Sequence, residues 1–172
     1  AWELSDRPDE NSVVNDGPLA GQTLHGLWTG QREEIFGTGL TRERFPLIIK
    51  ILDARDELSI QVHPPATVAP SLGGEPKTEM WYILHAEPGA DLIYGVREGV
   101  TPRSFRTALE AGRLEDCLHR LPVSAGDTVF IPAGSVHAIM EGIVLAEIQQ
   151  NSDTTYRVYD WNRVGADGQP RP

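Results

Sequence analysis

The sequence predicts an all-β fold, a sandwich or barrel of antiparallel strands. From Phe45 onward, short apolar or β-branched segments follow one another and are separated by glycine and proline. Many short strands with frequent turn signals are typical of these folds. We expect strands over residues 47–52, 58–62, 80–85, 91–96, 128–131, 143–148 and 156–161.

One segment interrupts this β pattern. Residues 101–117 read as a helical insertion, because Thr101-Pro102 is a helix-start signal. The insertion has an approximately apolar face, formed by Phe105, Ala108, Leu109, Leu114 and Leu118.

The first 44 residues form a mixed flank in front of the strands. Gly17-Pro18 marks a turn, and Leu24, Leu27, Trp28 and Phe36 are spaced to line a helix. With neither an internal repeat nor a clear linker, residues 1–172 are expected to be one domain, with residues 1–44 as its flank and residues 45–172 as its barrel.

Composition excludes several classes of protein. The 172 residues are 40% hydrophobic, which is enough for a folded core and argues against disorder. The net charge of -10 disfavours general binding to nucleic acid, and no apolar run is long enough to cross a bilayer. Cys117 is the single cysteine, so no internal disulfide forms, which fits a cytoplasmic location.

Four polar side chains in the strand region have the chemistry of metal ligands. Gln61 and His63 lie two residues apart on a predicted strand, so they point to the same face. Glu79 begins the next strand after a loop rich in proline and glycine. His137 follows a Pro-Ala-Gly turn that delivers it onto a new strand.

Two imidazoles, a carboxylate and an amide oxygen suit a zinc-like divalent ion. A single histidine in a β protein is more often a hydrogen-bonded core or surface residue. That interpretation is weaker for His63 and His137, because the sequence around each one positions its side chain. Strand alternation places His63 on the same face as Gln61, and a tight turn precedes His137.

Two motifs resemble those of the cupin superfamily. Residues 126–137 match the second cupin motif, a glycine, then Pro-x-Gly, then histidine, although Glu141 replaces its later asparagine. Gln61-Val62-His63 stands where the first motif has His-x-His. The resemblance implies a cupin β-barrel, similar to a jelly roll, with the short helical insertion and the mixed flank described above.

The combination of motifs resembles the type I mannose-6-phosphate isomerases, in particular their short bacterial form. It consists of Gln-Val-His-Pro at 61–64, Lys-Thr-Glu-Met-Trp-Tyr-Ile-Leu at 77–84, Pro-Ala-Gly-Ser-Val-His-Ala at 132–138, and the segment 147–161. The segments 2–6 and 15–21 are also similar. Members of the family usually have an additional N-terminal β segment and a second β domain, so this sequence is expected to be a central portion of such an enzyme.

The resemblance assigns site residues. It implies that Gln61, His63, Glu79 and His137 bind one zinc ion, and that Arg157 and Lys77 are catalytic. By residue type alone, Arg157 would be an ion-paired strand residue and Lys77 a solvated loop residue.

The implied function is interconversion of mannose 6-phosphate and fructose 6-phosphate through a cis-enediol, within carbohydrate metabolism. Zinc would act as a Lewis acid, and Arg157 would stabilise the developing negative charge. The general base stays open between Lys77, a hydroxide on the metal and a residue outside this sequence. The expected partner is a small sugar phosphate, with neither a nucleic acid nor a membrane.

Two other functions stay open. Two histidines and one carboxylate also form the facial triad of non-haem iron oxygenases, although Gln61 and the Arg157 segment argue against that class. A non-catalytic cupin that binds a sugar or a metal is the other alternative. The sequence does not determine the oligomeric state.

Overall fold

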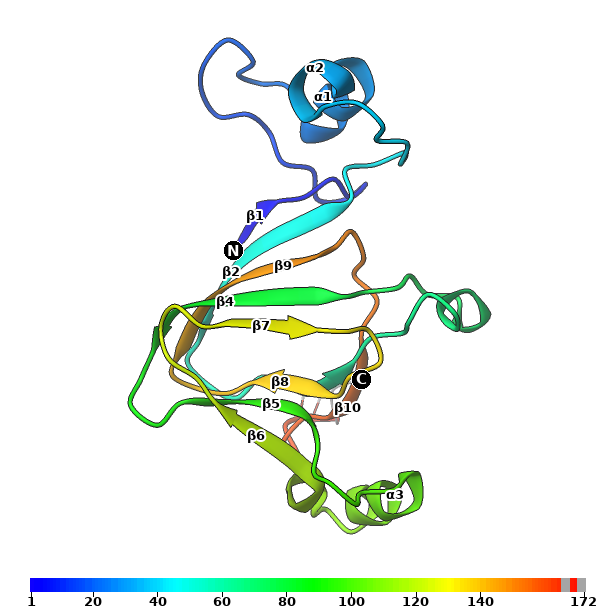
Figure 1. Ribbon diagram of the computed structural model, residues 1–172, viewed down its shortest axis with the longest axis vertical. Coiled ribbons are helices and arrows are strands. Elements are labelled where there is room, and N and C mark those ends of the chain that lie inside the picture. The colour runs from blue at the N-terminus through cyan, green and yellow to red at the C-terminus, as the bar shows by residue number, and fades with distance from the viewer. Residues whose placement is uncertain (165–167, 170–172) are drawn as a thin grey trace.

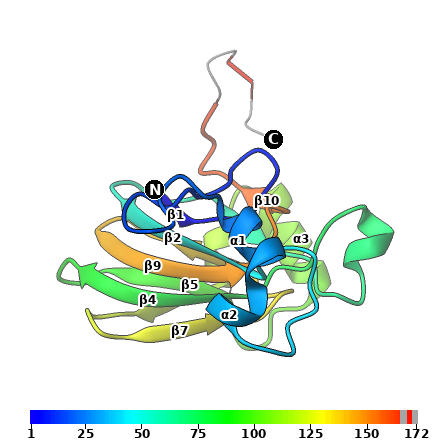
Figure 2. The ribbon, with the colours of Figure 1, turned by 90° about the horizontal axis from the view of Figure 1, so that it is seen from above.

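Two five-stranded antiparallel sheets lie face to face (Figures 1 and 2). The computed structural model describes residues 1–164 and 168–169. The first sheet has the order β1 (Trp2–Leu4), β2 (Leu47–Ala54), β9 (Ile143–Gln150), β4 (Glu79–Ala86) and β7 (Thr128–Ile131). The second has the order β10 (Tyr156–Tyr159), β3 (Ile60–Val62), β8 (His137–Ile139), β5 (Asp91–Val96) and β6 (Leu118–Pro122). The all-β prediction is confirmed.

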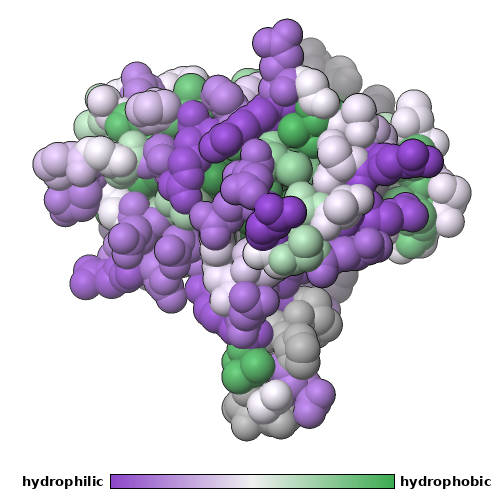
Figure 3. Space-filling view, turned by 90° about the horizontal axis from the view of Figure 1, so that it is seen from below, coloured by the Kyte–Doolittle hydropathy of each residue, from purple (hydrophilic) through white to green (hydrophobic). Residues whose placement is uncertain are grey.

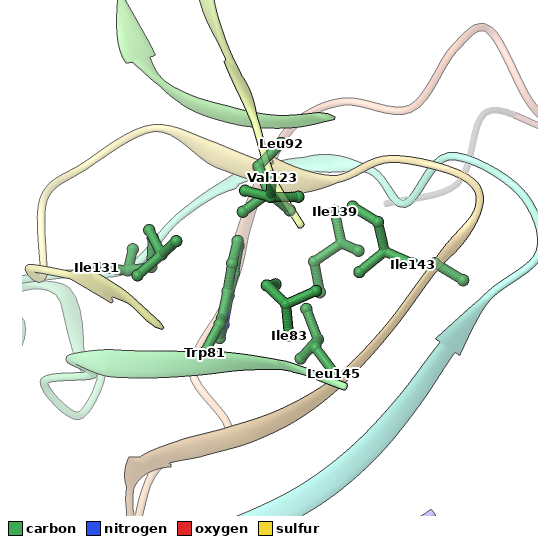
Figure 4. Packing of buried hydrophobic residues seen from close by; sticks show 10 residues of the cluster. Trp81, Ile83, Leu92, Val123, Ile131, Ile139, Ile143 and Leu145 are labelled. Carbon is green, nitrogen blue, oxygen red and sulfur yellow. The ribbon is translucent and has the colours of Figure 1, made fainter. Parts of the chain in front are cut away.

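The main core fills the space between the sheets. In β4, Trp81 and Ile83 are buried, whereas Tyr82 and Leu84 are exposed on the outer face. This alternation follows from the two-residue period of a strand. Figure 4 shows the inward side chains packed together from both sheets. The buried residues of this cluster are Ala54, Trp81, Ile83, Leu92, Val123, Val129, Ile131, Ile139, Ile143 and Leu145.

A second apolar cluster covers the other face of the second sheet. Helix α3 (Pro102–Glu110) places Phe105 and Leu109 against it. The buried members are Ile60, Ile93, Leu114, Leu118, Ala138 and Met140. Both faces of the second sheet are therefore packed. The surface on the α3 side of the molecule, seen from below, is mostly hydrophilic, and hydrophobic residues are scattered over it (Figure 3).

The helical insertion is shorter than predicted. α3 ends at Glu110, because Gly112 adopts a left-handed backbone with φ 65° and a 3-10 turn follows over Leu114–Cys117. Leu118, expected on the helical face, begins strand β6 instead. The sequence pattern was ambiguous here because the leucines are buried in either geometry.

The N-terminal flank contains two short helices, α1 (Leu24–Gly30) and α2 (Arg32–Phe36), which stand beyond the end of the first sheet (Figures 1 and 2). The rings of Trp28, Phe36 and Phe45 pack against one another at centroid distances of 5.2–5.5 Å. The flank also supplies β1, which the sequence did not predict and which pairs with β2.

One further boundary differs from expectation. The last predicted strand, 156–161, ends at Tyr159 because Trp161 and Asn162 have positive φ and form a turn. The loop after His63 contains a 3-10 turn over Ala69–Leu72. None of the helices among the described residues combines the length and the apolar character that a membrane crossing requires.

Candidate metal centre and adjoining pocket

His63 is delivered to the interior by β3. It follows the strand directly and is buried. Its Nδ1 lies 3.0 Å from the carbonyl oxygen of Thr154. A carbonyl can only accept, so Nδ1 carries the proton and the lone pair of Nε2 is left for another partner.

His137 is held in the same way at the start of β8. The preceding turn contains Gly134 with φ 94°, and its N–H donates to the carbonyl of His63 at 2.8 Å. The Nδ1 of His137 donates to the carbonyl of Ser135 at 2.9 Å. The turn therefore ties the two histidine segments together and again leaves Nε2 available.

The Nε2 atoms of both histidines face the carboxylate of Glu79. One carboxylate oxygen lies 3.1 Å from Nε2 of His63, and the other lies 3.7 Å from Nε2 of His137. The three ligand atoms lie within 4.8 Å of one another, and all three residues are buried. Two imidazoles and a carboxylate, each oriented by a backbone carbonyl or a neighbouring side chain, fit a divalent metal ion.

The electrostatics of the group favour the forms that bind a metal. Burial lowers the pKa of His137 to about 4, an effect that the nearby Glu79 charge only partly offsets. Burial by itself would raise the pKa of Glu79. The interaction with His63 and the charge of Lys77 instead hold it at about 2. At neutral pH the carboxylate is charged and His137 is neutral.

Gln61 lies beside this group. It is the direct cross-strand partner of His137, so the two side chains share one face of the second sheet. Its amide nitrogen donates to the Ser59 hydroxyl at 3.0 Å. Its assignment as a fourth ligand stays a prediction, which this placement supports.

Lys77 is buried rather than solvated. Its side chain is 6% exposed, and Nζ lies 3.2 Å from the Glu79 carboxylate. The loop that precedes β4 folds the lysine inward, where the buried carboxylate compensates its charge. Lys77 is thus part of the site, as the family resemblance implied and as its residue type did not.

A pocket of about 230 Å³ opens beside the metal group. Its polar walls include Lys77, Glu79 and Trp81 from one side, and Gln61 and His137 from the other. Its apolar walls include Leu52, Leu58, Ala138 and Ile139. A concave site with a few converging polar groups is the usual form of a small-molecule site.

Sequence reasoning missed Glu147 and Lys50. Glu147 is 5% exposed and lines the pocket. Lys50 lies 3.0 Å from its carboxylate, and the Trp81 indole N–H is shared between Glu147 and Glu79 at 3.2 and 3.1 Å. Burial and the charge of Glu79 raise the pKa of Glu147. The alternation of the strand could have located Glu147. It follows the inward Leu145 by two residues, so its side chain points to the same face.

Arg157 lies next to the pocket rather than in its wall. It is the cross-strand partner of Gln61, so the side chains of Arg157, Gln61 and His137 form one row across three strands. Arg157 lines a separate surface hollow of about 340 Å³, which also includes Ser59 and Gln61. The structure therefore brings Gln61, His63, Lys77, Glu79 and His137 together and puts Arg157 at the border.

Comparison with known proteins gives consistent results. Residues 1–73 match the model of the phosphomannose isomerase type I catalytic domain. The mannose-6-phosphate isomerase of Streptococcus mutans is 44% identical over 171 residues, which are 99% of this chain and 53% of that protein. The crystal structure of the mannose 6-phosphate isomerase from Bacillus subtilis superposes with a TM-score of 0.87 at 39% identity, covering 99% of this chain and 54% of that one.

A zinc-bound structure of mannose 6-phosphate isomerase shares the fold, with a TM-score of 0.64 at 15% identity, over 91% of this chain and 61% of that one. The two facing antiparallel sheets and the buried His-Glu-His group define a cupin fold with a candidate metal centre. Within that class, the chain is similar to the type I phosphomannose isomerases. It spans about half the length of the relatives it matches.

Proposed function

We propose that this chain carries the metal centre of an isomerase that interconverts mannose 6-phosphate and fructose 6-phosphate. One zinc ion would be held by His63, Glu79 and His137, with Gln61 as the fourth ligand. The observation that carries the proposal is the convergence of two oriented imidazoles and a carboxylate within 4.8 Å, beside a pocket with room for a small molecule. Relatives that bear this activity in their names cover the whole chain.

The reaction moves a proton between C1 and C2 of the sugar through a cis-enediol. The difficult step is removal of a weakly acidic C–H beside a carbonyl. When bound, zinc supplies Lewis acidity that stabilises negative charge on the reacting oxygens. Lys77 keeps a positive charge at the pocket wall and fixes the Glu79 carboxylate from 3.2 Å. Arg157 adds a positive charge at the pocket border, where the anionic end of the substrate can enter.

Glu147 is the pocket carboxylate best placed to carry the proton. Trp81 and Lys50 hold its carboxylate in a fixed orientation. Lys50 also lines the pocket, so it can exchange a proton or hydrogen-bond a sugar hydroxyl. The proposal includes a reducing compartment such as the cytoplasm, in keeping with the free, buried Cys117.

The test is an assay coupled to fructose 6-phosphate, run on this chain before and after chelation. We expect chelation to abolish turnover and added zinc to restore it. A folded, fully zinc-loaded chain without turnover would contradict the isomerase assignment and favour a non-catalytic cupin. Metal analysis of protein purified without added metal provides a second check, because bound iron with oxygen-dependent turnover would identify an oxygenase instead.

A further inference from the structure

The hydroxyl of Ser59 is a shared acceptor beside the metal centre. Ser59 comes just before β3, two residues from Gln61 and four from His63, so all three side chains face the interior. Ser59 is 7% exposed. Its Oγ accepts one hydrogen bond from the Gln61 amide at 3.0 Å and another from Nε of Arg157 at 3.2 Å.

This arrangement bears on which atom of the Gln61 amide meets a metal ion. Only Oε1 of the amide can bind a cation, since the NH₂ group presents hydrogens. The NH₂ group is engaged by Ser59, so Oε1 points away from Ser59 within the amide plane. Gln61 shares its face with its cross-strand partner His137, a member of the metal group.

Arg157 also favours the orientation of Gln61 in which the NH₂ group faces Ser59. Its Nε–H can only donate, so it occupies one lone pair of the Ser59 oxygen and leaves one for the Gln61 amide. The three side chains form a short chain of hydrogen bonds from the pocket border to the metal group. One hydroxyl thus sets the positions of both Gln61 and Arg157.

We propose that Ser59 is a positioning residue, which turns the carbonyl oxygen of Gln61 toward the metal and anchors Arg157 to the same oxygen atom. The inference rests on the proposed function, because it takes Gln61 as the fourth ligand. Ser59 acts through Gln61, so its effect on metal affinity depends on the amide being present. A serine that only filled space in a strand would not have this dependence.

A double-mutant cycle on zinc affinity tests the coupling. The chain is stripped with a chelator and titrated with zinc in competition with a chromophoric chelator. The variants are Ser59→Ala, Gln61→Ala and the two combined. Because a lost orienting partner typically weakens metal binding 10- to 100-fold, we expect Ser59→Ala to weaken zinc binding about tenfold. In the Gln61→Ala background, the same substitution should have no further effect.

Two further variants act as controls. Ser59→Thr keeps the hydroxyl and should retain wild-type affinity to within about twofold. Ser71→Ala removes an exposed serine that bonds only the carbonyl of Val68, and should change nothing. Far-UV circular dichroism checks the fold of each variant. If Ser59→Ala does not fold, Ser59→Cys replaces it, because sulfur is a weak acceptor of similar size.

The outcomes separate this inference from the proposed function. Wild-type affinity in Ser59→Ala, or an equal loss with and without the Gln61 amide, would overturn the role of Ser59 and leave the metal centre standing. A wild-type chain that binds zinc no better than His137→Ala would overturn the metal centre and the role of Ser59 together.

Discussion

At the scale of single residues, the site depends on how each ligand atom is presented. In both His63 and His137, Nδ1 hydrogen-bonds a backbone carbonyl. This bond fixes the tautomer and directs Nε2 toward Glu79. Backbone carbonyls do not titrate. The arrangement is therefore in place before any metal arrives, which lowers the cost of binding.

Removal of one imidazole should abolish tight metal binding. We expect His137→Ala to weaken zinc affinity by at least about 100-fold, since a ligand is lost as well as its orienting bond. The β fold should survive, because the core clusters do not include His137. The matched control is His85→Ala, since His85 is exposed and its ring nitrogen lies 3.3 Å from the carboxylate of Glu87, outside the metal group. Stoichiometric zinc in the His137 variant, measured by metal analysis, would refute the ligand assignment.

Stability of the metal-free chain should fall on acidification. The folded pKa of His137, about 4, lies below its ordinary 6.5, so the unfolded chain binds the extra proton between these values. Stability from this group is full above pH 6.5 and is lost as the pH falls toward 4. By pH 5 the loss is about 2 kcal/mol. The lowered pKa of Glu79 adds a further loss of stability as the pH falls below 4.5. The raised pKa of Glu147 has the opposite effect on stability.

Urea unfolding of the chelated chain at pH 7 and pH 5 checks this effect. The variant His137→Asn cannot titrate at this position. Comparison with it separates the contribution of His137 from those of the carboxylates. The free-energy difference between the two proteins should shrink toward pH 5. A difference that does not change with pH would contradict a depressed pKa at His137.

Proton transfer provides a third residue-scale test. Glu147→Gln keeps the size and hydrogen bonds of the side chain but removes its basicity. We expect kcat to fall by about 100- to 10,000-fold while zinc affinity changes little. Glu141→Gln is the control, since Glu141 is exposed and lines a hollow other than the pocket beside the metal group. An unchanged kcat in Glu147→Gln would remove Glu147 from the mechanism.

At the scale of elements, α3 supports the barrel without reaching the site. A capping box joins Thr101 and Ser104 at its start, and Phe105 and Leu109 attach it to the second core cluster. The helix lines neither the metal group nor the pocket beside it. Its local stability and the metal chemistry should therefore be separable.

Loss of the helix cap should change stability alone. We expect Thr101→Ala to cost about 1 kcal/mol in the free energy of unfolding, because the N–H of Ser104 loses its hydrogen-bond acceptor. Thr107→Ala, at an exposed position within α3, should be neutral or slightly stabilising. Both are measured by urea denaturation with zinc affinity followed in parallel. A cap variant with altered zinc affinity would contradict the independence of helix and site.

At the scale of the whole molecule, two sheets are held together by one shared core, and the metal group lies between strands of both. Glu79 comes from the first sheet, whereas His63 and His137 come from the second. The site can therefore form only when the sheets have packed. Metal affinity consequently reports on the tertiary fold, not on either sheet alone.

Neighbouring residues of β4 test this packing. Ile83 is fully buried between the sheets, whereas Leu84 is 44% exposed on the outer face. Because a cavity remains in the core, Ile83→Ala should cost about 2–5 kcal/mol in the free energy of unfolding. Leu84→Ala should cost less than about 1 kcal/mol. Equal effects in urea unfolding would show that β4 does not present Ile83 to the core.

Much of the fold could be predicted from local pattern. Alternation and turn residues locate β2, β3, β4, β5, β7, β9 and β10 to within a few residues, because strand period and turn chemistry are local properties. Strand β1 lies in the mixed flank and β6 follows the segment expected to be helical, so only pairing with a neighbour defines them. The end of the last strand was also missed, since a turn at Trp161 decides it.

By itself, the sequence determined the strand class, the family resemblance and the residue types that can bind a metal. Only the tertiary structure decided that Lys77 is buried against Glu79, that Glu147 faces the pocket and that Arg157 stays at its border. The reason is physical. A ligand set, a buried charge pair and a pocket wall are each made by segments far apart in the chain. Their distances are set by how the two sheets pack, which local pattern does not contain.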